Sequence, residues 1–256
     1  MEATNFSLRA YFERIGYRGP EATDRQTLTA IMRHQLRAVP FENLDVQAGK
    51  VVSLVPEDIV EKILDNGRGG YCYEVNGLFA MAVQALGVPY RMVGARPRTY
   101  ASRRPKTHMA LILTFEGERW LFDLGFGSHG IRAPLSLDRP DTDVVQDFDT
   151  YRLEKIGDDR YLLRTVVEGN WADQYEFDLS PQEWVDFVPA NFLNSKHPDS
   201  IFVQHLVAVR QTDEGRIILL DNTFKIIARG QMQSRSVAPH ERDAVLLSEF
   251  GLVAPR

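Results

Sequence analysis

Apolar residues recur at the three-to-four-residue spacing of an α-helix in three stretches of the first ninety residues. The stretches cover residues 23–40, 55–67 and 72–89. Each is bounded by residues that start or stop helices, such as Pro56 near the start of the second and Gly87 at the end of the third. The pattern therefore predicts a helical N-terminal segment.

Beyond this segment, apolar residues occupy alternate positions, which is typical of β-strands. Residues 108–124 predict a β-hairpin with Glu116 and Gly117 as its two-residue turn. Residues 151–167 predict a second hairpin that turns at residues 157–159. The middle of the chain is therefore expected to be a sheet of antiparallel strands.

The last part of the chain combines strands with a closing helix. Residues 201–229 supply three more strands, and residues 238–252 predict a short helix. We expect Ala244, Leu247 and Phe250 to face inward from this helix.

Helices that precede strands in blocks, rather than alternating with them, indicate the α+β class. The expected segments are residues 1–90 with helices, residues 91–195 with strands, and residues 196–256 with strands and the last helix. A chain of 256 residues with 44% hydrophobic residues can bury a sizeable core.

Charge and composition exclude several classes of function. The net charge of -5 gives no reason to expect a nucleic acid or an anionic membrane as partner. The N-terminal residues do not resemble a signal peptide, and no apolar run is long enough to span a bilayer. One cysteine cannot form an internal disulfide, so we expect a cytoplasmic protein, with a homo-oligomer left open.

The single cysteine, Cys72, stands at the start of the third predicted helix. A lone cysteine is most often a small buried apolar side chain. Here, Gly69 and Gly70 can adopt backbone conformations that other residues avoid, which suits a sharp entry into a helix. In the first helical turn, free N–H groups and the helix dipole favour a thiolate. The position therefore favours a nucleophile, with a plain core residue as the alternative.

A cysteine nucleophile needs a base and a group that orients the base. In a hairpin that turns at residues 116–117, His108 and Asp123 lie on one face as diagonal neighbours, with Cβ atoms about 7 Å apart. A partner would also offset the cost of burying Asp123. The pair is equally compatible with a structural role that pins the hairpin. Periodicity does not show that Cys72 meets it.

These residues resemble signatures of the arylamine N-acetyltransferase family. Residues 68–79, RGGYCYEVNGLF, resemble its RGGxCxExN motif. Residues 106–113, KTHMALIL, resemble its histidine strand, and residues 122–127, FDLGFG, resemble its aspartate strand. Residues 39–46 and 197–210 match further blocks in the family order. The resemblance covers the whole chain.

The resemblance implies an N-terminal helical bundle, a central β-barrel and a C-terminal α/β lid, with a cysteine-protease-like catalytic core. It implies a catalytic triad of Cys72, His108 and Asp123. The implied reaction is ping-pong transfer of an acetyl group from acetyl-CoA, through acetyl-Cys72, to an aromatic amine, hydrazine or N-hydroxyarylamine. Thioester exchange is nearly balanced in energy, so we expect no metal and no prosthetic group. An oxyanion hole is expected to include the Cys72 backbone N–H.

The resemblance also implies which residues contact the substrates. Phe41, Phe126 and Phe202 are expected to shape the acceptor pocket, although each is compatible with plain core packing. Thr107 and Gly127 are the expected coenzyme A contacts.

Two further groups of polar residues have less specific interpretations. The basic run of Arg103, Arg104 and Lys106 is either solvated or meets coenzyme A phosphates. Five polar residues of the motifs are expected to hold the surrounding structure by hydrogen bonds rather than to contact substrate: Glu42, Asn43, Arg68, Glu74 and Asn76.

Three alternative functions fit parts of this pattern. The same triad serves family members that transfer a longer acyl chain and close a macrolactam as amide synthases. A papain-like peptidase or a transglutaminase uses the same nucleophile, but lacks the RGGxCxExN agreement. A non-catalytic binding module would bind its partner without Cys72.

Overall fold

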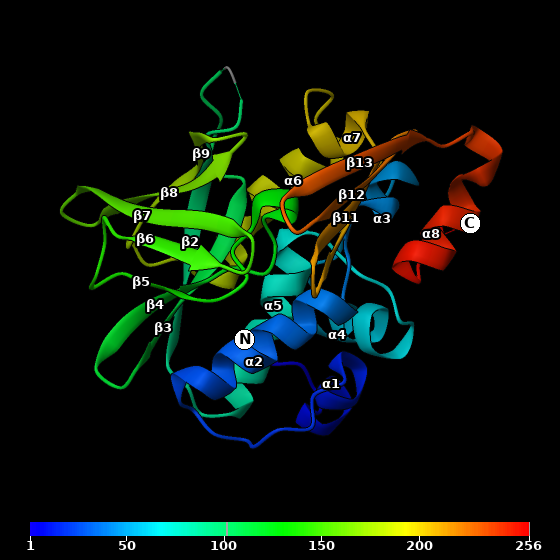
Figure 1. The fold of residues 1–256 in the computed structure, drawn as a ribbon. Coiled ribbons are helices and arrows are strands. Elements are labelled where there is room, and N and C mark those ends of the chain that lie inside the picture. Colours follow the sequence, from blue (N-terminus) through cyan, green and yellow to red (C-terminus); the bar gives the residue numbers. More distant parts are fainter. Residues whose placement is uncertain (101, 256) are drawn as a thin grey trace.

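The structure, a computed structural model that describes residues 1–100 and 102–255, contains two antiparallel sheets and surrounding helices (Figure 1). The α-helices are α1 (Leu8–Ile15), α2 (Arg25–Ala38), α3 (Leu44–Gln47), α4 (Pro56–Val60), α5 (Cys72–Ala85), α6 (Val188–Lys196), α7 (Ile201–Gln204) and α8 (Arg242–Phe250). The other helical stretches are the π-helical η1 (Glu61–Asp65) and the 3₁₀-helical η2 (Gly127–His129), η3 (Trp184–Phe187) and η4 (Pro239–Glu241).

The strands form one sheet of eight and one sheet of five. Those of the larger sheet are β2 (Tyr90–Pro97), β3 (His108–Phe115), β4 (Glu118–Phe122), β5 (Leu135–Ser136), β6 (Asp143–Gln146), β7 (Asp149–Gly157), β8 (Arg160–Val167) and β9 (Asn170–Asp178). Those of the smaller sheet are β1 (Phe41–Glu42), β10 (Val207–Thr212), β11 (Gly215–Leu220), β12 (Thr223–Ala228) and β13 (Gln231–Ser236).

The three helices expected in the first ninety residues are confirmed. Helix α2 begins after Asp24, whose carboxylate accepts a hydrogen bond from the backbone N–H of Thr27 at 2.9 Å. Helix α4 begins at Pro56 and continues into η1. Helix α5 begins at Cys72, so the boundary signals in the sequence located each start.

The eight-stranded sheet has the order β5-β4-β3-β2-β9-β8-β7-β6. Its β3–β4 hairpin has the expected register, with Phe115 opposite Glu118 and Ile112 opposite Leu121. At one edge of the sheet, the Gln146 side chain of β6 accepts hydrogen bonds from the backbone N–H groups that precede β5 at the other edge. The sheet is therefore a nearly closed barrel, as expected.

The five-stranded sheet has the order β1-β10-β11-β12-β13, and α8 packs against it. Strands β10, β11 and β12 are the three expected from the C-terminal part of the chain. Strand β1 was not predicted. It has only two residues, Phe41 and Glu42, which pair with Val209 and Ala208. So short a strand has no periodicity, and its partner lies far along the sequence.

Two expectations about the C-terminal part are wrong. Residues Ile201–Gln204 form the helix α7 rather than the beginning of a strand. In α8, Phe250 is buried as expected, but the inward positions of Ala244 and Leu247 are wrong. Ala244 is exposed and Leu247 is 58% exposed, whereas Val245 and Leu246 point inward. Four consecutive residues of α8 are apolar, so their spacing did not decide which of them face the sheet.

Helices and sheets pack on one another across the expected segment boundaries. Helix α5 packs on β3, and β1 pairs with β10. The division near residues 90 and 195 therefore stays a prediction. Within the described residues, we find no helix with the length and apolar character needed to cross a membrane.

Candidate active site

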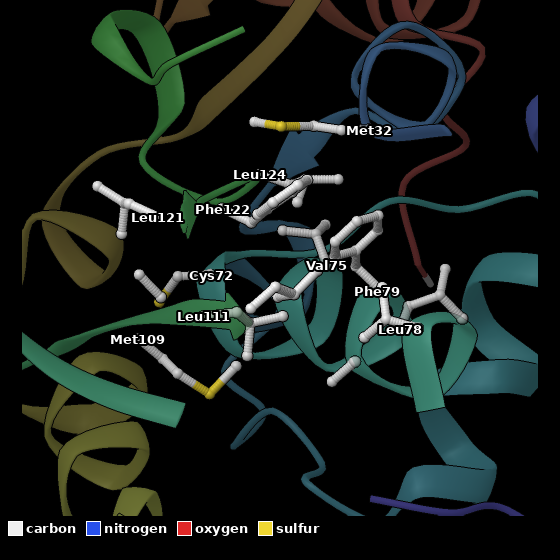
Figure 2. Close-up of a cluster of buried hydrophobic side chains, with 14 of the residues drawn as sticks. Met32, Cys72, Val75, Leu78, Phe79, Met109, Leu111, Leu121, Phe122 and Leu124 are labelled. Carbon is white, nitrogen blue, oxygen red and sulfur yellow. The ribbon is translucent and has the colours of Figure 1, made fainter. Parts of the chain in front are cut away.

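Cys72 is the first residue of α5, where an extended loop enters the helix. Its side chain is only 3% exposed. It lies at the border of an apolar cluster that includes Val75 of α5, Met109 of β3 and Leu121 of β4 (Figure 2). The cysteine also lines a cavity. It is therefore buried among apolar side chains and accessible to a small molecule from one side.

Close packing explains the two glycines before the cysteine. A Cβ atom at Gly69 would lie 2.0 Å from the carbonyl oxygen of Pro40, and one at Gly70 would lie 2.6 Å from the Glu74 carboxylate. Neither glycine has a positive φ. The expected reason, an unusual backbone conformation, is therefore wrong, and the need is for space.

Glu74 fixes the loop that leads to the cysteine. Its Oε2 atom accepts a hydrogen bond from the backbone N–H of Tyr71 at 2.9 Å. Its Oε1 atom accepts a hydrogen bond from the Lys62 ammonium group at 2.6 Å. Burial raises the pKa of Glu74 to about 7, although Lys62 and the Tyr71 N–H oppose this rise. In the same buried cluster, Arg68 binds Glu42 at 2.7 Å. These contacts agree with the scaffold interpretation.

His108 and Asp123 are hydrogen-bonded, as the hairpin geometry predicted. The His108 Nε2 atom lies 2.8 Å from Asp123 Oδ2. The other carboxylate oxygen accepts the side-chain amide of Asn76 at 3.0 Å and the backbone N–H of Gly125 at 2.9 Å. Asp123 is fully buried, and these three donors satisfy its charge.

Gly125 brings the aspartate loop against the cysteine helix, because a Cβ atom there would lie 2.6 Å from the Cα atom of Cys72. Cys72 and His108 line the same cavity, and the thiol is near enough to the imidazole to raise its pKa. Burial lowers the pKa of His108, but Asp123 and Cys72 outweigh it and raise the pKa to about 10. Burial raises the pKa of Asp123, but His108 and Asn76 hold it below its usual range. The favoured state of His108 is therefore an imidazolium held by the anionic carboxylate of Asp123.

The backbone carbonyl of Thr107 faces the cysteine. The Cys72 Sγ atom lies 3.9 Å from this oxygen, and both the Tyr73 hydroxyl and the Asn194 side-chain amide donate to it at 2.9 Å. Asn194 comes from α6, far along the sequence from the other three residues. No spacing or motif in the sequence connected it with the cysteine, so sequence reasoning missed it.

A cavity of about 320 Å³ opens onto Cys72 and His108. Every residue expected to contact acceptor or coenzyme lines it: Phe41, Phe126, Phe202, Thr107 and Gly127. The rings of Phe41 and Phe202 pack with centroids 5.9 Å apart, and the Phe126 ring lies 5.1 Å from the His108 ring. The cavity thus offers aromatic surface beside the sulfur. Among the described residues, no group of three or more potential metal ligands occurs.

Further residues at this cavity were not singled out from the sequence. His129 and Gln174 line the cavity, and the Tyr175 ring packs 5.0 Å from the His108 ring. Burial lowers the pKa of His129, which keeps this imidazole neutral at pH 7. His129 stands two residues after Gly127, so its nearness to the FDLGFG block was the available signal.

Comparison with known proteins agrees with the geometry. A family model described as N-acetyltransferase matches residues 24–255. An arylamine N-acetyltransferase of Escherichia coli K12 is 33% identical over 252 residues, which cover 96% of this chain and 88% of that protein. An arylamine N-acetyltransferase / N-hydroxyarylamine O-acetyltransferase of Salmonella typhimurium LT2 is 34% identical over 219 residues, which cover 84% of this chain and 76% of that protein.

Solved structures of arylamine N-acetyltransferases also have a fold similar to that of this chain. The arylamine N-acetyltransferase of Mycobacterium marinum in complex with CoA superposes with a TM-score of 0.89 and 31% sequence identity. The superposition covers 96% of this chain and 92% of that chain. The likeness therefore extends over both sheets and the helices.

Proposed function

The chain belongs to the arylamine N-acetyltransferase family, and on this premise we propose that it transfers an acetyl group from acetyl-coenzyme A to arylamines, arylhydrazines or N-hydroxyarylamines. Cys72 is the nucleophile, His108 the acid and base, and Asp123 the group that orients the imidazole. One observation carries the proposal. The His108 Nε2 atom lies 2.8 Å from Asp123 Oδ2, and His108 and Cys72 line the same aromatic cavity.

In the first half-reaction, the Cys72 thiolate attacks the carbonyl carbon of the thioester. A bond forms between Cys72 Sγ and this carbon, and the bond from the carbon to the coenzyme sulfur breaks. His108 gives its proton to the leaving coenzyme A thiolate. Because Nε2 of His108 is held by Asp123, Nδ1 is the ring nitrogen that faces the reacting sulfur atoms. The products are free coenzyme A and acetyl-Cys72.

In the second half-reaction, the acceptor nitrogen attacks the acetyl carbon on Cys72. The new N–C bond replaces the C–Sγ bond, and His108 takes the proton that the nitrogen loses. Cys72 returns to the thiolate, and the imidazolium is restored. Asp123 stabilises the imidazolium in both states without taking the proton.

The start of α5 stabilises the oxyanion that forms in each half-reaction. The first backbone N–H groups of a helix have no acceptor within the helix. The N–H of Cys72 is one of them, and it lies next to the carbon that the sulfur attacks. The helix dipole adds positive potential at the same place.

The cavity holds the acceptor and the acyl end of the donor. Phe41, Phe126 and Phe202 present ring faces and edges that suit an aromatic amine. Thr107 and Gly127 lie at the wall of the cavity and contact the donor. The Gly127 φ of +78° favours glycine, and no side chain narrows the cavity there. A reducing cytoplasm is the compartment that keeps the Cys72 thiol free.

Steady-state kinetics test this proposal. Initial rates are measured over a grid of acetyl-CoA and arylamine concentrations. The proposal predicts parallel double-reciprocal lines, because coenzyme A leaves before the amine reacts. Intersecting lines would show that both substrates bind before chemistry, and would contradict a reaction through acetyl-Cys72.

A further inference from the structure

The side chain of Asn194 is hydrogen-bonded at only one of its two ends. Its Nδ2 atom donates a hydrogen bond to the backbone oxygen of Thr107 at 2.9 Å. Because a backbone carbonyl oxygen only accepts hydrogen bonds, the NH₂ end of the amide must face Thr107, and Oδ1 is the other end. We find no donor to this Oδ1 atom among the residues that the structure describes. A buried amide therefore keeps one acceptor without a partner in the protein.

The free oxygen of Asn194 is open rather than enclosed. The side chain is only 5% exposed, and the residue lines the active-site cavity. Within the described part of the chain, the enclosed side-chain oxygens that lack a partner belong to Gln174, Tyr175 and Gln211, and Asn194 Oδ1 is not one of them. A small molecule can therefore reach this oxygen, and the cavity is the opening that the residue lines.

The helix that carries Asn194 is held in place by other polar contacts. Asn191, three residues earlier on α6, is satisfied at both ends of its side chain. Its Nδ2 atom donates to the backbone oxygen of Val52 at 2.9 Å, and its Oδ1 atom accepts a hydrogen bond from the Tyr71 hydroxyl. The Ser200 hydroxyl donates to the backbone oxygen of Asn194 at 2.7 Å. The position of the free amide oxygen is therefore fixed before a substrate enters.

The amide of Asn194 also lies beside the reacting sulfur. The Thr107 oxygen that it binds lies 3.9 Å from Cys72 Sγ. In the second half-reaction, a primary arylamine brings two N–H groups to the acetyl carbon on this sulfur, and His108 takes one proton. The Thr107 oxygen already accepts hydrogen bonds from Asn194 and from the Tyr73 hydroxyl, so it is not free for the second N–H. The free oxygen of the amide is an acceptor at this place.

We propose that Asn194 Oδ1 accepts a hydrogen bond from the attacking nitrogen of the acceptor, and that the site thereby selects primary amines and hydrazines, which carry a second N–H group. This inference rests on the proposed function and names the acceptor class that the same site prefers. The nitrogen gains positive charge as it attacks, so its N–H groups become stronger donors. The hydrogen bond is therefore stronger in the transition state than in the bound amine, and it speeds the second half-reaction.

The test compares p-anisidine with N-methyl-p-anisidine in the parent and in Asn194→Leu. The N-methyl amine has one N–H group, which His108 takes, so it has none left for Asn194. Leucine is close to asparagine in size and has no polar side-chain atom. Asn170→Leu is the matched control, because Asn170 is an exposed residue of β9. Thermal denaturation checks that each protein folds, and Asn194→Ala replaces the leucine variant if that variant does not.

Two rate constants are measured separately for each protein. Acetylation of Cys72 by acetyl-CoA is followed without amine, and loss of the acetyl group from the isolated acetyl-enzyme is then followed with each amine. The proposal predicts that Asn194→Leu slows transfer to the primary amine roughly tenfold more than transfer to the N-methyl amine. Acetylation of Cys72 should slow by a few-fold at most, since only the contact with Thr107 is lost. Asn170→Leu should match the parent with both amines.

An equal fall for the two amines in Asn194→Leu would overturn the proposal, because the amide would then act only through the Thr107 oxygen. A fall confined to acetylation by acetyl-CoA would also overturn it, since the amide would then serve the donor. Both results leave acetyl-Cys72 and the proposed function intact. Absence of acetyl-Cys72 in the parent would instead overturn the proposed function.

Discussion

Asn76 holds the carboxylate of Asp123 from the same helix that carries the cysteine. Its side-chain N–H group donates a hydrogen bond to Asp123 Oδ1 at 3.0 Å. Its side-chain oxygen, Oδ1, accepts a hydrogen bond from the backbone N–H of Leu124 at 2.8 Å. Asn76 lies one helical turn after Cys72, so the two residues stand above one another on α5. One helix therefore sets the distance between Cys72 and Asp123, the proposed nucleophile and the proposed orienting group.

Replacing Asn76 with alanine should lower both activity and stability. The change leaves the Leu124 N–H and one lone pair of Asp123 unsatisfied in the core, which costs about 1–3 kcal/mol. A rotated Asp123 carboxylate would misplace His108, which lowers kcat by up to about 100-fold. Denaturant unfolding and steady-state assays measure the two effects. Asn170→Ala, at an exposed asparagine, is the control, and equal behaviour of the two variants would contradict the role of Asn76.

Replacing Gly125 with alanine should push the aspartate loop away from α5. The new methyl group would lie 2.6 Å from the Cα atom of Cys72 and 2.9 Å from the Asn76 side chain, so backbone must move. We expect a loss of about 1–3 kcal/mol in the free energy of unfolding and a large loss of kcat. Gly130→Ala is the matched control, because its Cβ atom would meet no atom closer than 3.5 Å. Activity of Gly125→Ala equal to that of Gly130→Ala would refute this account of the loop.

Replacing Asn194 tests the role of the Thr107 backbone carbonyl, which faces the sulfur of Cys72. Asn194 and Tyr73 both donate to the Thr107 oxygen, and this reduces its repulsion of an anionic sulfur. We expect Asn194→Ala to slow alkylation of Cys72 by iodoacetamide at pH 7 by a few-fold, and to cost about 0.5–1.5 kcal/mol in stability. Asn194→Asp, which has the same size but no donor at neutral pH, should slow it further. Parental alkylation in Asn194→Asp would show that the donor is not needed.

The His108–Asp123 pair predicts how stability depends on pH. The pKa of His108 is raised to about 10, above its unfolded value near 6.5. A raised pKa means that the folded state binds the proton more tightly, so the contribution is complete below about pH 6.5 and is lost as the pH rises toward 10. Urea unfolding at pH 7 and pH 10 should therefore show a larger loss for the parent than for His108→Gln. An equal loss in both proteins would contradict a charged His108 in the folded state.

Local signals in the sequence were sufficient for much of the site. The two-residue turn at Glu116 and Gly117 fixed the hairpin register, and that register placed His108 next to Asp123. Pro56 and the residues before Cys72 located the starts of α4 and α5. In each case the decisive interaction joins residues close in the sequence, where turn geometry and helix spacing apply directly.

Contacts between distant parts of the chain could not be predicted in this way. The approach of α5 to the β3–β4 hairpin depends on Gly125 and on packing that no periodicity encodes. Strand β1, and the Asn194 contact with Thr107, join residues far apart along the chain. Packing also decided the face of α8 and the helical form of Phe202 and its neighbours. Only the resemblance to a family connected Cys72 with His108.

The most direct measurement is an intact mass spectrum of the protein after incubation with acetyl-CoA and no amine. The parent should gain the mass of one acetyl group, Cys72→Ala should gain none, and adding an arylamine should remove the adduct from the parent. If the parent shows no adduct while Cys72 still reacts with iodoacetamide, the acetyl-cysteine intermediate is contradicted. A peptidase assay would then test the alternative use of the same nucleophile.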